Sequence, residues 1–378
     1  MTNPIVQGWC PGAHRPMMSG DGLVVRVRPF RAELTAAQGL ALCALTQRYG
    51  NGTLDLTSRA NLQIRGVTRA DHPALLQKLD ALGLIDAAPA IEGHRNILLA
   101  PDWQPDGLTA RLYDTLLQQL SALPVLPEKM GFALDTGRDA CLAGGSADFR
   151  LELSEQGDLI LRADGAAMGR HITEAEAMSA LAELAQWFVA TGGPEHGRMA
   201  RHLKHVSLPT VWQDAPPRPE APPFRPGAVP GGMILGVPFG AIPAPALAAL
   251  LSDSGTESLR LMLGRHLWLR GATPGAAPGF VTAPGSALLT THACPGAPFC
   301  PQATVETRAL AARLAGTVPG PLHVSGCAKG CAQPRVAALT LTGRAGRFDL
   351  IRNGAPWDAP TQRSLDPDNI LPFLIETT

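Results

Sequence analysis

The stretch that decides the fold reads ACPGAPFC at residues 293–300 and VSGCAKGC at residues 324–331. It places four cysteines in a C-x5-C pair and a C-x3-C pair: Cys294, Cys300, Cys327 and Cys331. Glycine and proline surround both pairs, so the backbone can wrap closely around a bulky inorganic group and point N–H groups at sulfur. The spacing therefore predicts a [4Fe–4S] cluster bound by these four thiolates.

Two other interpretations of the four cysteines stay open. Structural zinc sites usually use C-x2–4-C knuckles, and a five-residue loop paired with a three-residue loop suits zinc less well. The four cysteines could also be unrelated buried thiols, although four of the seven cysteines fall within one short stretch. Cys43 lies on the apolar face of a predicted helix and is expected to be a core residue.

Composition narrows the class of protein. The 378 residues are 45% hydrophobic and 17% charged, with 32 basic against 32 acidic side chains, which indicates a globular chain of two or three domains. Zero net charge and 5% aromatic content argue against a nucleic-acid partner. No long apolar run and no signal-peptide layout is present, so we expect a cytoplasmic protein with no membrane partner and with reduced thiols.

Hydrophobic periodicity predicts a duplicated unit of strand, helix, strand and strand. The first copy has strands at 23–27, 53–57 and 62–67, and a helix that begins with a capping box at Thr35 and Gln38. The second copy has strands at 233–237, 259–263 and 267–270, and a helix at 245–251. Gln63-Ile-Arg-Gly66 aligns with Trp268-Leu-Arg-Gly271. Chance similarity within an α/β chain is the alternative.

The remaining segments complete the predicted organisation. Helices are expected at 71–82, 108–122, 173–190 and 304–315, and hairpins at 149–162 and 336–352. The proline-rich residues 215–230 read as a stiff linker. The expected division is a first half-domain at 1–70, an α/β lobe at 71–214, the linker at 215–230, a second half-domain at 231–275 and an iron–sulfur lobe at 276–378.

The cysteine segments, together with three upstream motifs, resemble the sirohaem-dependent nitrite and sulfite reductase family. The motifs are Thr57-Ser-Arg-Ala-Asn-Leu-Gln-Ile-Arg-Gly66, His94-Arg-Asn-Ile97 and Leu126-Pro-Glu-Lys-Met-Gly-Phe132. The resemblance implies an α+β fold in which a duplicated ferredoxin-like half-domain and two α/β lobes surround a cleft. It places Arg59, Arg95 and Lys129 on the family's anion-binding cations.

Departures from that pattern point to one branch of the family. Glu128 and Gly131 stand where cations are expected, and Ala328-Lys329 replaces the usual Pro-Asn. These changes, with the opening Trp9-Cys-Pro-Gly12, resemble the precorrin-3B synthase branch. That resemblance implies O2-dependent hydroxylation of precorrin-3A at C20 with γ-lactone formation. It also implies a [4Fe–4S] cluster, a mononuclear non-haem iron, and an external electron donor that is NADH through a reductase or a reduced protein.

Candidate site residues follow from the substrate's many carboxylates, which basic side chains would bind. The expected substrate-binding residues are Arg59, Arg65, Arg95, Lys129 and Lys329, with Arg138 and Arg150 as weaker candidates. Weak candidates for iron ligands are His94, His202 and His205. Two rival functions remain: a sirohaem sulfite or nitrite reductase with an altered anion site, and a non-catalytic iron–sulfur electron-transfer protein.

Overall fold

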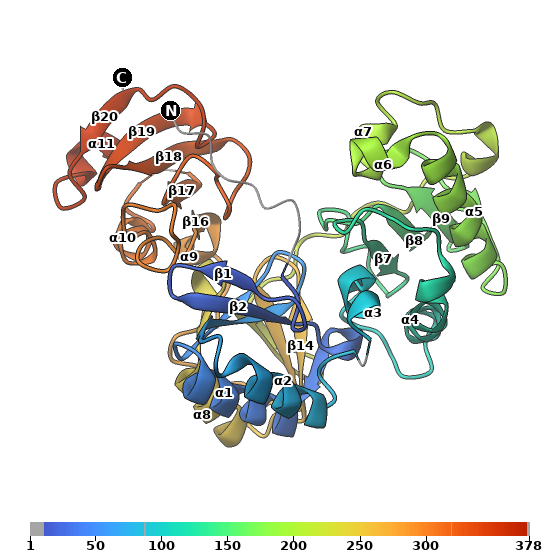
Figure 1. Ribbon diagram of the computed structural model, residues 1–378, viewed down its shortest axis with the longest axis horizontal. Helices are drawn as coiled ribbons and strands as arrows, with labels where there is room; N and C mark the ends of the chain where they lie inside the picture. Colours follow the sequence, from blue (N-terminus) through green and yellow to red (C-terminus); the bar gives the residue numbers. More distant parts are fainter. Residues whose placement is uncertain (1–10, 87, 319, 376–378) are drawn as a thin grey trace.

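The described part of the chain forms four five-stranded sheets, two in a central body and one in each of two lobes (Figure 1). The computed structural model describes residues 11–86, 88–318 and 320–375. The opening Trp9 and Cys10 therefore lie outside the described residues. No helix in the described part of the chain is long and apolar enough to cross a membrane.

The central body consists of two copies of one unit. The first copy comprises β1 (Met17–Ser19), β2 (Gly22–Val27), β3 (Glu33–Thr35), α1 (Ala36–Tyr49), β4 (Thr53–Leu56) and β5 (Leu62–Val67). The second comprises β11 (Gly227–Val229), β12 (Gly232–Gly236), β13 (Ala241–Pro243), α8 (Ala244–Asp253), β14 (Ser258–Met262) and β15 (His266–Arg270). The element order is the same in both copies, as the duplication predicted.

The two copies exchange a strand. Their sheets run β1-β2-β5-β4-β13 and β11-β12-β15-β14-β3, so each sheet ends on a strand from the other copy. Helices α1 and α8 pack against each other, and one hydrophobic core contains buried residues from both copies, among them Leu42 and Leu247. Because strands and core are shared, the two copies form one folding unit.

Backbone conformation repeats along with the elements. Gly66 and Gly271, which align in the repeat, have φ of 75° and 76°. Ala60 and Arg265, at equivalent places in the two hairpin turns, have φ of 51° and 64°. A left-handed conformation costs roughly 1–2 kcal/mol for a residue with a Cβ, so the turn geometry is imposed by the strands around it.

The lobes share a second topology. In chain order their sheets run β6-β7-β8-β9-β10 and β16-β17-β18-β19-β20, each with two parallel pairs followed by two antiparallel pairs. The first lobe contains β6 (Ile97–Leu99), α4 (Leu108–Gln119), β7 (Phe132–Asp135), β8 (Phe149–Leu153), β9 (Leu159–Ala163), β10 (Arg170–His171), α5 (Ala177–Ala190), α6 (Gly193–His196) and α7 (Met199–His202). It is preceded by α2 (His72–Ala81) and α3 (Pro89–His94). The second lobe contains α9 (Ala287–Thr290), β16 (Thr291–Ala293), α10 (Arg308–Leu314), β17 (Leu322–Ser325), β18 (Ala337–Arg344), β19 (Arg347–Gly354), β20 (Gln362–Leu365) and α11 (Leu371–Ile375).

Two local predictions were wrong. The helix expected at 304–315 begins only at Arg308, because the preceding residues turn back on the first cysteine loop through Ala297 N–H to Val305 O at 2.8 Å. The segment 215–230 is not only a linker: it is bonded to the first lobe through Ala221 N–H to Ala140 O at 2.8 Å, and it ends in strand β11.

Candidate functional site

The four cysteines follow neighbouring parallel strands of the second lobe. Cys294 comes directly after β16, and Cys327 lies two residues beyond β17, so the two loops meet at one edge of the sheet. All four thiols are free. Cys294 is buried, Cys300 and Cys327 are half-buried, and Cys331 is exposed. The structure thus brings the four predicted cysteines together, with Cys331 as the one that faces solvent.

Backbone N–H groups and the charge of Lys329 favour thiolates at these four cysteines. Gly326 N–H donates to Cys294 Sγ at 3.2 Å, and a Cβ on Gly326 would lie 2.6 Å from Ala303 Cβ. Burial raises the pKa of Cys327, and a backbone N–H of Lys329 lowers it. Although Cys331 is the most exposed of the four residues, burial of its thiol by the surrounding loops raises its pKa to about 11. The Lys329 ammonium lowers this pKa, and the other three cysteines raise it further. Four clustered thiols of this kind need a bound cation to ionise together.

The chemistry of these residues fits an iron–sulfur cluster. Within residues 11–86, 88–318 and 320–375, no set of three or more His, Cys, Asp or Glu side chains converges closely enough to hold one metal ion. A [4Fe–4S] cluster makes a different demand, because each thiolate binds a different iron at its own corner. Free thiols on two glycine-rich loops with inward N–H donors meet that demand.

The first half-domain holds the cysteine loop in place. The carbonyl oxygen of Phe299, next to Cys300, accepts three hydrogen bonds: from Gly20 N–H at 3.1 Å, Ser19 Oγ at 2.7 Å and Arg65 Nη2 at 2.9 Å. Gly20 is required here, because a Cβ would lie 2.3 Å from Pro298 O. Contacts made far apart in the sequence therefore fix the geometry of the C-x5-C loop.

We expect Gly20→Ala to weaken this junction by about 1–3 kcal/mol, since the added methyl group overlaps a backbone oxygen. Thermal or urea unfolding measures the change. Gly144→Ala is the matched control, because its added Cβ would have no neighbour within 4 Å. Equal stability of the two variants would contradict the role given to Gly20.

Arg65 is a buried structural residue in this geometry. Its guanidinium lies 2.9 Å from Asp21 and 3.6 Å from Asp55, and it also donates to the cysteine loop. Asp55 in turn binds Arg308 at 2.6 Å, at the start of α10. Arg65 therefore joins the half-domain to the cysteine lobe, and its charge is already balanced by two carboxylates.

Arg59 and Lys129 come together between the half-domain and the first lobe. Arg59 Nη2 donates to Lys129 O at 2.8 Å and to Ser146 Oγ at 3.0 Å. The other side of this loop is held by Asn96, whose Nδ2 donates to Met130 O at 3.1 Å. Of the predicted substrate-binding residues, Arg59 and Lys129 are therefore in contact, through the Arg59 guanidinium and the Lys129 backbone carbonyl.

Packing explains why residue 131 is a glycine. Its N–H donates to Asp148 Oδ2 at 3.1 Å, and a Cβ would lie 2.7 Å from Asn96 O. A lysine at this position would collide with the backbone. Glu128, the other departure from the family pattern, binds Arg15 at 3.0 Å on the surface. Neither position supplies a cation to the junction.

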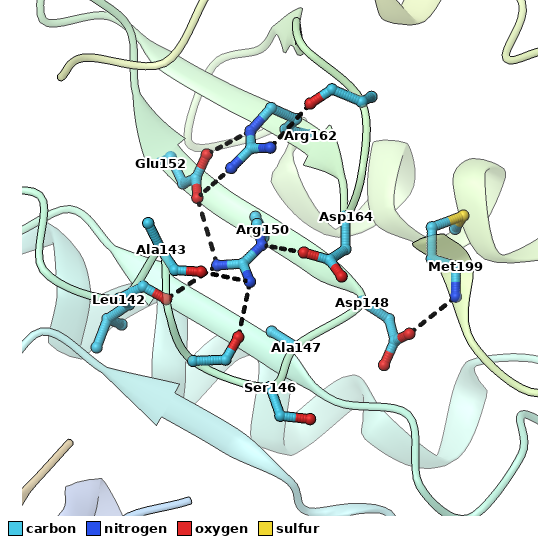
Figure 2. Close-up of polar contacts among 12 residues, drawn as sticks. Leu142, Ala143, Ser146, Ala147, Asp148, Arg150, Glu152, Arg162, Asp164 and Met199 are labelled. Atoms are coloured by element: carbon cyan, nitrogen blue, oxygen red, sulfur yellow. Dashed lines mark hydrogen bonds and ion pairs between the residues drawn. The ribbon is translucent and has the colours of Figure 1, made fainter. Parts of the chain in front are cut away.

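Sequence reasoning missed the network around Asp148. This fully buried carboxylate accepts hydrogen bonds from Arg198 Nε at 2.8 Å and from Met199 N–H at 2.9 Å. Figure 2 shows it beside Met199. Arg198 Nη1 also donates to Ser146 Oγ at 3.1 Å, the same hydroxyl that Arg59 contacts. No local pattern links these residues, which lie fifty positions apart.

The other predicted arginines do not gather at one site. Arg95 is buried against Asp86 at 2.9 Å and stacks over Phe30. Arg150 is buried in the first lobe, where it binds Asp164 at 2.7 Å and three loop carbonyls (Figure 2). Arg138 is 80% exposed beside Asp139. In this structure Arg95 and Arg150 brace the fold, and Arg138 lies at the surface.

Helices α3 and α7, which end at His94 and His202, lie on the side of the first lobe, away from the cysteine lobe, and His205 follows α7 (Figure 1). His94 ends α3 and lines an apolar cavity of about 200 Å³. His202 is buried with both ring nitrogens engaged, Nε2 by Thr191 Oγ1 at 2.8 Å and Nδ1 by His196 Nδ1 at 2.9 Å. His205 is exposed and stacks on His196. Their role as iron ligands stays a prediction, and the geometry around His202 favours a packing role.

The hydrogen bonds around His202 predict a pH-dependent stability. Thr191 Oγ1 donates to Trp187 O at 2.7 Å, so it accepts from His202 Nε2, and His202 Nδ1 then accepts from His196. Burial, followed by the charges of His196 and His205, lowers the pKa of His202. The unfolded chain therefore binds more protons, and the free energy of unfolding should fall as pH drops below about 6.5.

Urea unfolding at pH 7.5 and pH 5.5 measures this effect. His202→Gln should reduce the difference between the two pH values, whereas His171→Gln, at a half-exposed position, should leave it unchanged. If His202→Gln showed the same difference in the free energy of unfolding between the two pH values as wild type, His202 would not be the group responsible.

Comparison with known proteins shows the family to which the chain belongs. A family model described as the nitrite/sulfite reductase ferredoxin-like half domain matches residues 15–82. A precorrin-3B synthase from Sinorhizobium sp is 31% identical over 94% of this chain and 84% of its own length. The chain belongs to the precorrin-3B synthase family. This confirms the resemblance expected from the sequence.

Two further relatives show how this family connects to the reductases. A ferredoxin–nitrite reductase from Leptolyngbya laminosa is 24% identical over 90% of this chain and 80% of its own length. The solved structure of the Mycobacterium tuberculosis NirA protein superposes with a TM-score of 0.67 at 19% identity, covering 93% of this chain and 79% of NirA. The α+β fold with a duplicated half-domain and two lobes is thus the nitrite/sulfite reductase fold.

Proposed function

We propose that this precorrin-3B synthase family member hydroxylates precorrin-3A at C20 with dioxygen and closes a γ-lactone, as a cytoplasmic enzyme of aerobic cobalamin biosynthesis. One oxygen atom enters the substrate and the other leaves as water, with electrons supplied by an external donor, either NADH through a reductase or a reduced protein. The observation that carries the proposal is the similarity to a precorrin-3B synthase along 94% of the chain.

Cys294, Cys300, Cys327 and Cys331 are the residues that would hold a [4Fe–4S] cluster. Bound there, the cluster would supply electron transfer, and a mononuclear non-haem iron would supply oxygen activation. Lys329 would stabilise the thiolates, since its backbone N–H and its ammonium both oppose the effect of burial on their pKa. Exposed Cys331 would mark the side from which electrons enter.

Arg59 and Lys129 would bind carboxylates of the substrate. They lie next to each other at the junction of half-domain and lobe, and Asn96 holds the loop that carries Lys129. Each charge-assisted contact is worth roughly 1.5–3 kcal/mol. Gly131 and Glu128 add no cations at the positions where the reductases are expected to have them, which is consistent with a bulky substrate rather than a small anion.

Oxygen consumption tests the proposal. Protein purified without oxygen, given precorrin-3A and a chemical reductant, should take up dioxygen and form a product one oxygen atom heavier. Arg59→Gln and Lys129→Gln should raise KM more than they lower kcat, because both contacts bind the substrate in the ground state. No oxygen uptake by a cluster-loaded protein would favour a non-catalytic electron-transfer protein instead.

A sirohaem nitrite or sulfite reductase is the second candidate, favoured by the similarity to a ferredoxin–nitrite reductase over 90% of the chain. Visible absorbance separates the two. Intense sirohaem bands, with nitrite- or sulfite-dependent reoxidation of the reduced protein, would support the reductase. A broad iron–sulfur shoulder without such bands supports the monooxygenase.

A further inference from the structure

Arg265 is a cation for which the fold supplies no acidic partner. It lies in the turn between β14 and β15, and its guanidinium donates to Thr291 O at 3.0 Å and to Leu289 O. Among the described residues no carboxylate lies close enough to act on its charge. Burial lowers its pKa to about 10. A guanidinium that is desolvated but not neutralised favours the arrival of an anion.

Two histidines lie on the strands that lead to the cysteine loops. His292 and His323 are register partners in the parallel pair β16 and β17, so both point to the same face of the sheet. His323 is fully buried, and neither of its ring nitrogens has a hydrogen-bond partner in the part of the chain that the structure describes. A buried polar side chain left in this state requires an explanation.

Backbone contacts connect the three side chains. Arg265 Nη1 donates to Thr291 O, in the residue directly before His292, and His292 is the register partner of His323. Burial lowers the pKa of His323 to about 4, so its ring is neutral at pH 7 and keeps one N–H to donate. Guanidinium and imidazole N–H groups together are donors suited to a carboxylate.

The repeat supplies an independent reason. Arg265 occupies the place of Ala60 in the equivalent turn of the first copy, directly after Arg59. Each copy thus carries an arginine at its hairpin turn, and each arginine reaches the adjacent lobe: Arg59 at Lys129 O, and Arg265 at the first residue of β16.

We propose that Arg265, His292 and His323 form a second anion-binding recess, between the second half-domain and the cysteine lobe, and that it receives a carboxylate of a polycarboxylated tetrapyrrole. This inference rests on the proposed function, because the tetrapyrrole substrate supplies the carboxylate. Arg59 and Arg265 would then bind two different carboxylates of one ring.

Binding of uroporphyrin, a stable polycarboxylated tetrapyrrole, to the cluster-loaded protein tests the proposal by fluorescence titration. Arg265→Gln should raise Kd about tenfold or more, the loss of one charge-assisted contact, while Arg265→Lys should stay within about threefold of wild type. Arg313→Gln, at an exposed arginine of the cysteine lobe, is the control and should bind as wild type does. Should Arg265→Gln fail to fold, His323→Phe keeps a buried ring without its nitrogens, and weaker binding by that variant supports the recess.

Each outcome has a distinct meaning. Weakened binding in Arg59→Gln with wild-type binding in Arg265→Gln, or in His323→Phe where that variant is used, would overturn the recess and leave the proposed function in place. Absence of uroporphyrin binding to wild type, or unchanged binding in both arginine variants, would overturn the tetrapyrrole class itself and the recess with it.

Discussion

Replacing Cys327 by serine is expected to leave a protein that purifies without bound sulfide and without the broad iron–sulfur absorbance. A serine hydroxyl is a far poorer ligand for iron than a thiolate, and the C-x3-C loop has no other sulfur to offer except Cys331. Iron and sulfide analysis of protein purified without oxygen measures the loss. Oxygen uptake with precorrin-3A should disappear with it.

Cys141→Ser is the matched control. Cys141 is half-buried in the first lobe, where its thiol donates to Asp135 at 3.6 Å, and burial raises its pKa. This variant should keep full iron and sulfide. Loss of the cluster in both variants would indicate general instability rather than ligation, and retention in both would remove Cys327 from the proposed ligand set.

Asp148→Asn should produce the largest loss of stability. The carboxylate is fully buried and serves three donors at once: the guanidinium of Arg198 and the backbone N–H groups of Gly131 and Met199. Breaking a buried pair by removing one charge costs roughly 3–5 kcal/mol. Because Arg198 is 25% exposed, water compensates part of the loss, and we expect about 3 kcal/mol.

Urea unfolding, followed through a spectroscopic signal from the first lobe, measures this change in the free energy of unfolding. Asp158→Asn, at a position 68% exposed in the β8–β9 hairpin, should change the free energy of unfolding by less than about 0.5 kcal/mol. Asp148→Asn should also raise Kd for uroporphyrin, since Arg198 and Arg59 share Ser146. A variant as stable as wild type would contradict the central role of this carboxylate.

Much of the fold followed from local pattern. The alternating runs at 62–67 and 267–270 and the capping box at Thr35 predicted elements that the structure contains. The exchanged strands β3 and β13 could not be predicted, because three residues carry no periodicity and their partners belong to the other copy. The topology shared by the two lobes was equally hidden, since it depends on which strands pair rather than on the strands themselves.

The candidate site also has features that the local sequence predicts and features that it does not. Cysteine spacing is local, so the quartet was visible in the sequence. Whether an arginine has an acidic partner is not a local property: Arg65 and Arg95 have carboxylate partners, and Arg265 has none among the described residues. Nothing in their immediate sequence indicates this difference. The same is true of His323, whose unsatisfied ring follows from its strand partner and its burial.

The most direct test of this account is the iron, sulfide and zinc content of the wild-type protein purified without oxygen, taken with its visible spectrum. The account predicts a brown protein with acid-labile sulfide bound through the four cysteines of the second lobe, and no intense sirohaem bands. A colourless protein that lacks sulfide, or one that holds only zinc, would contradict it.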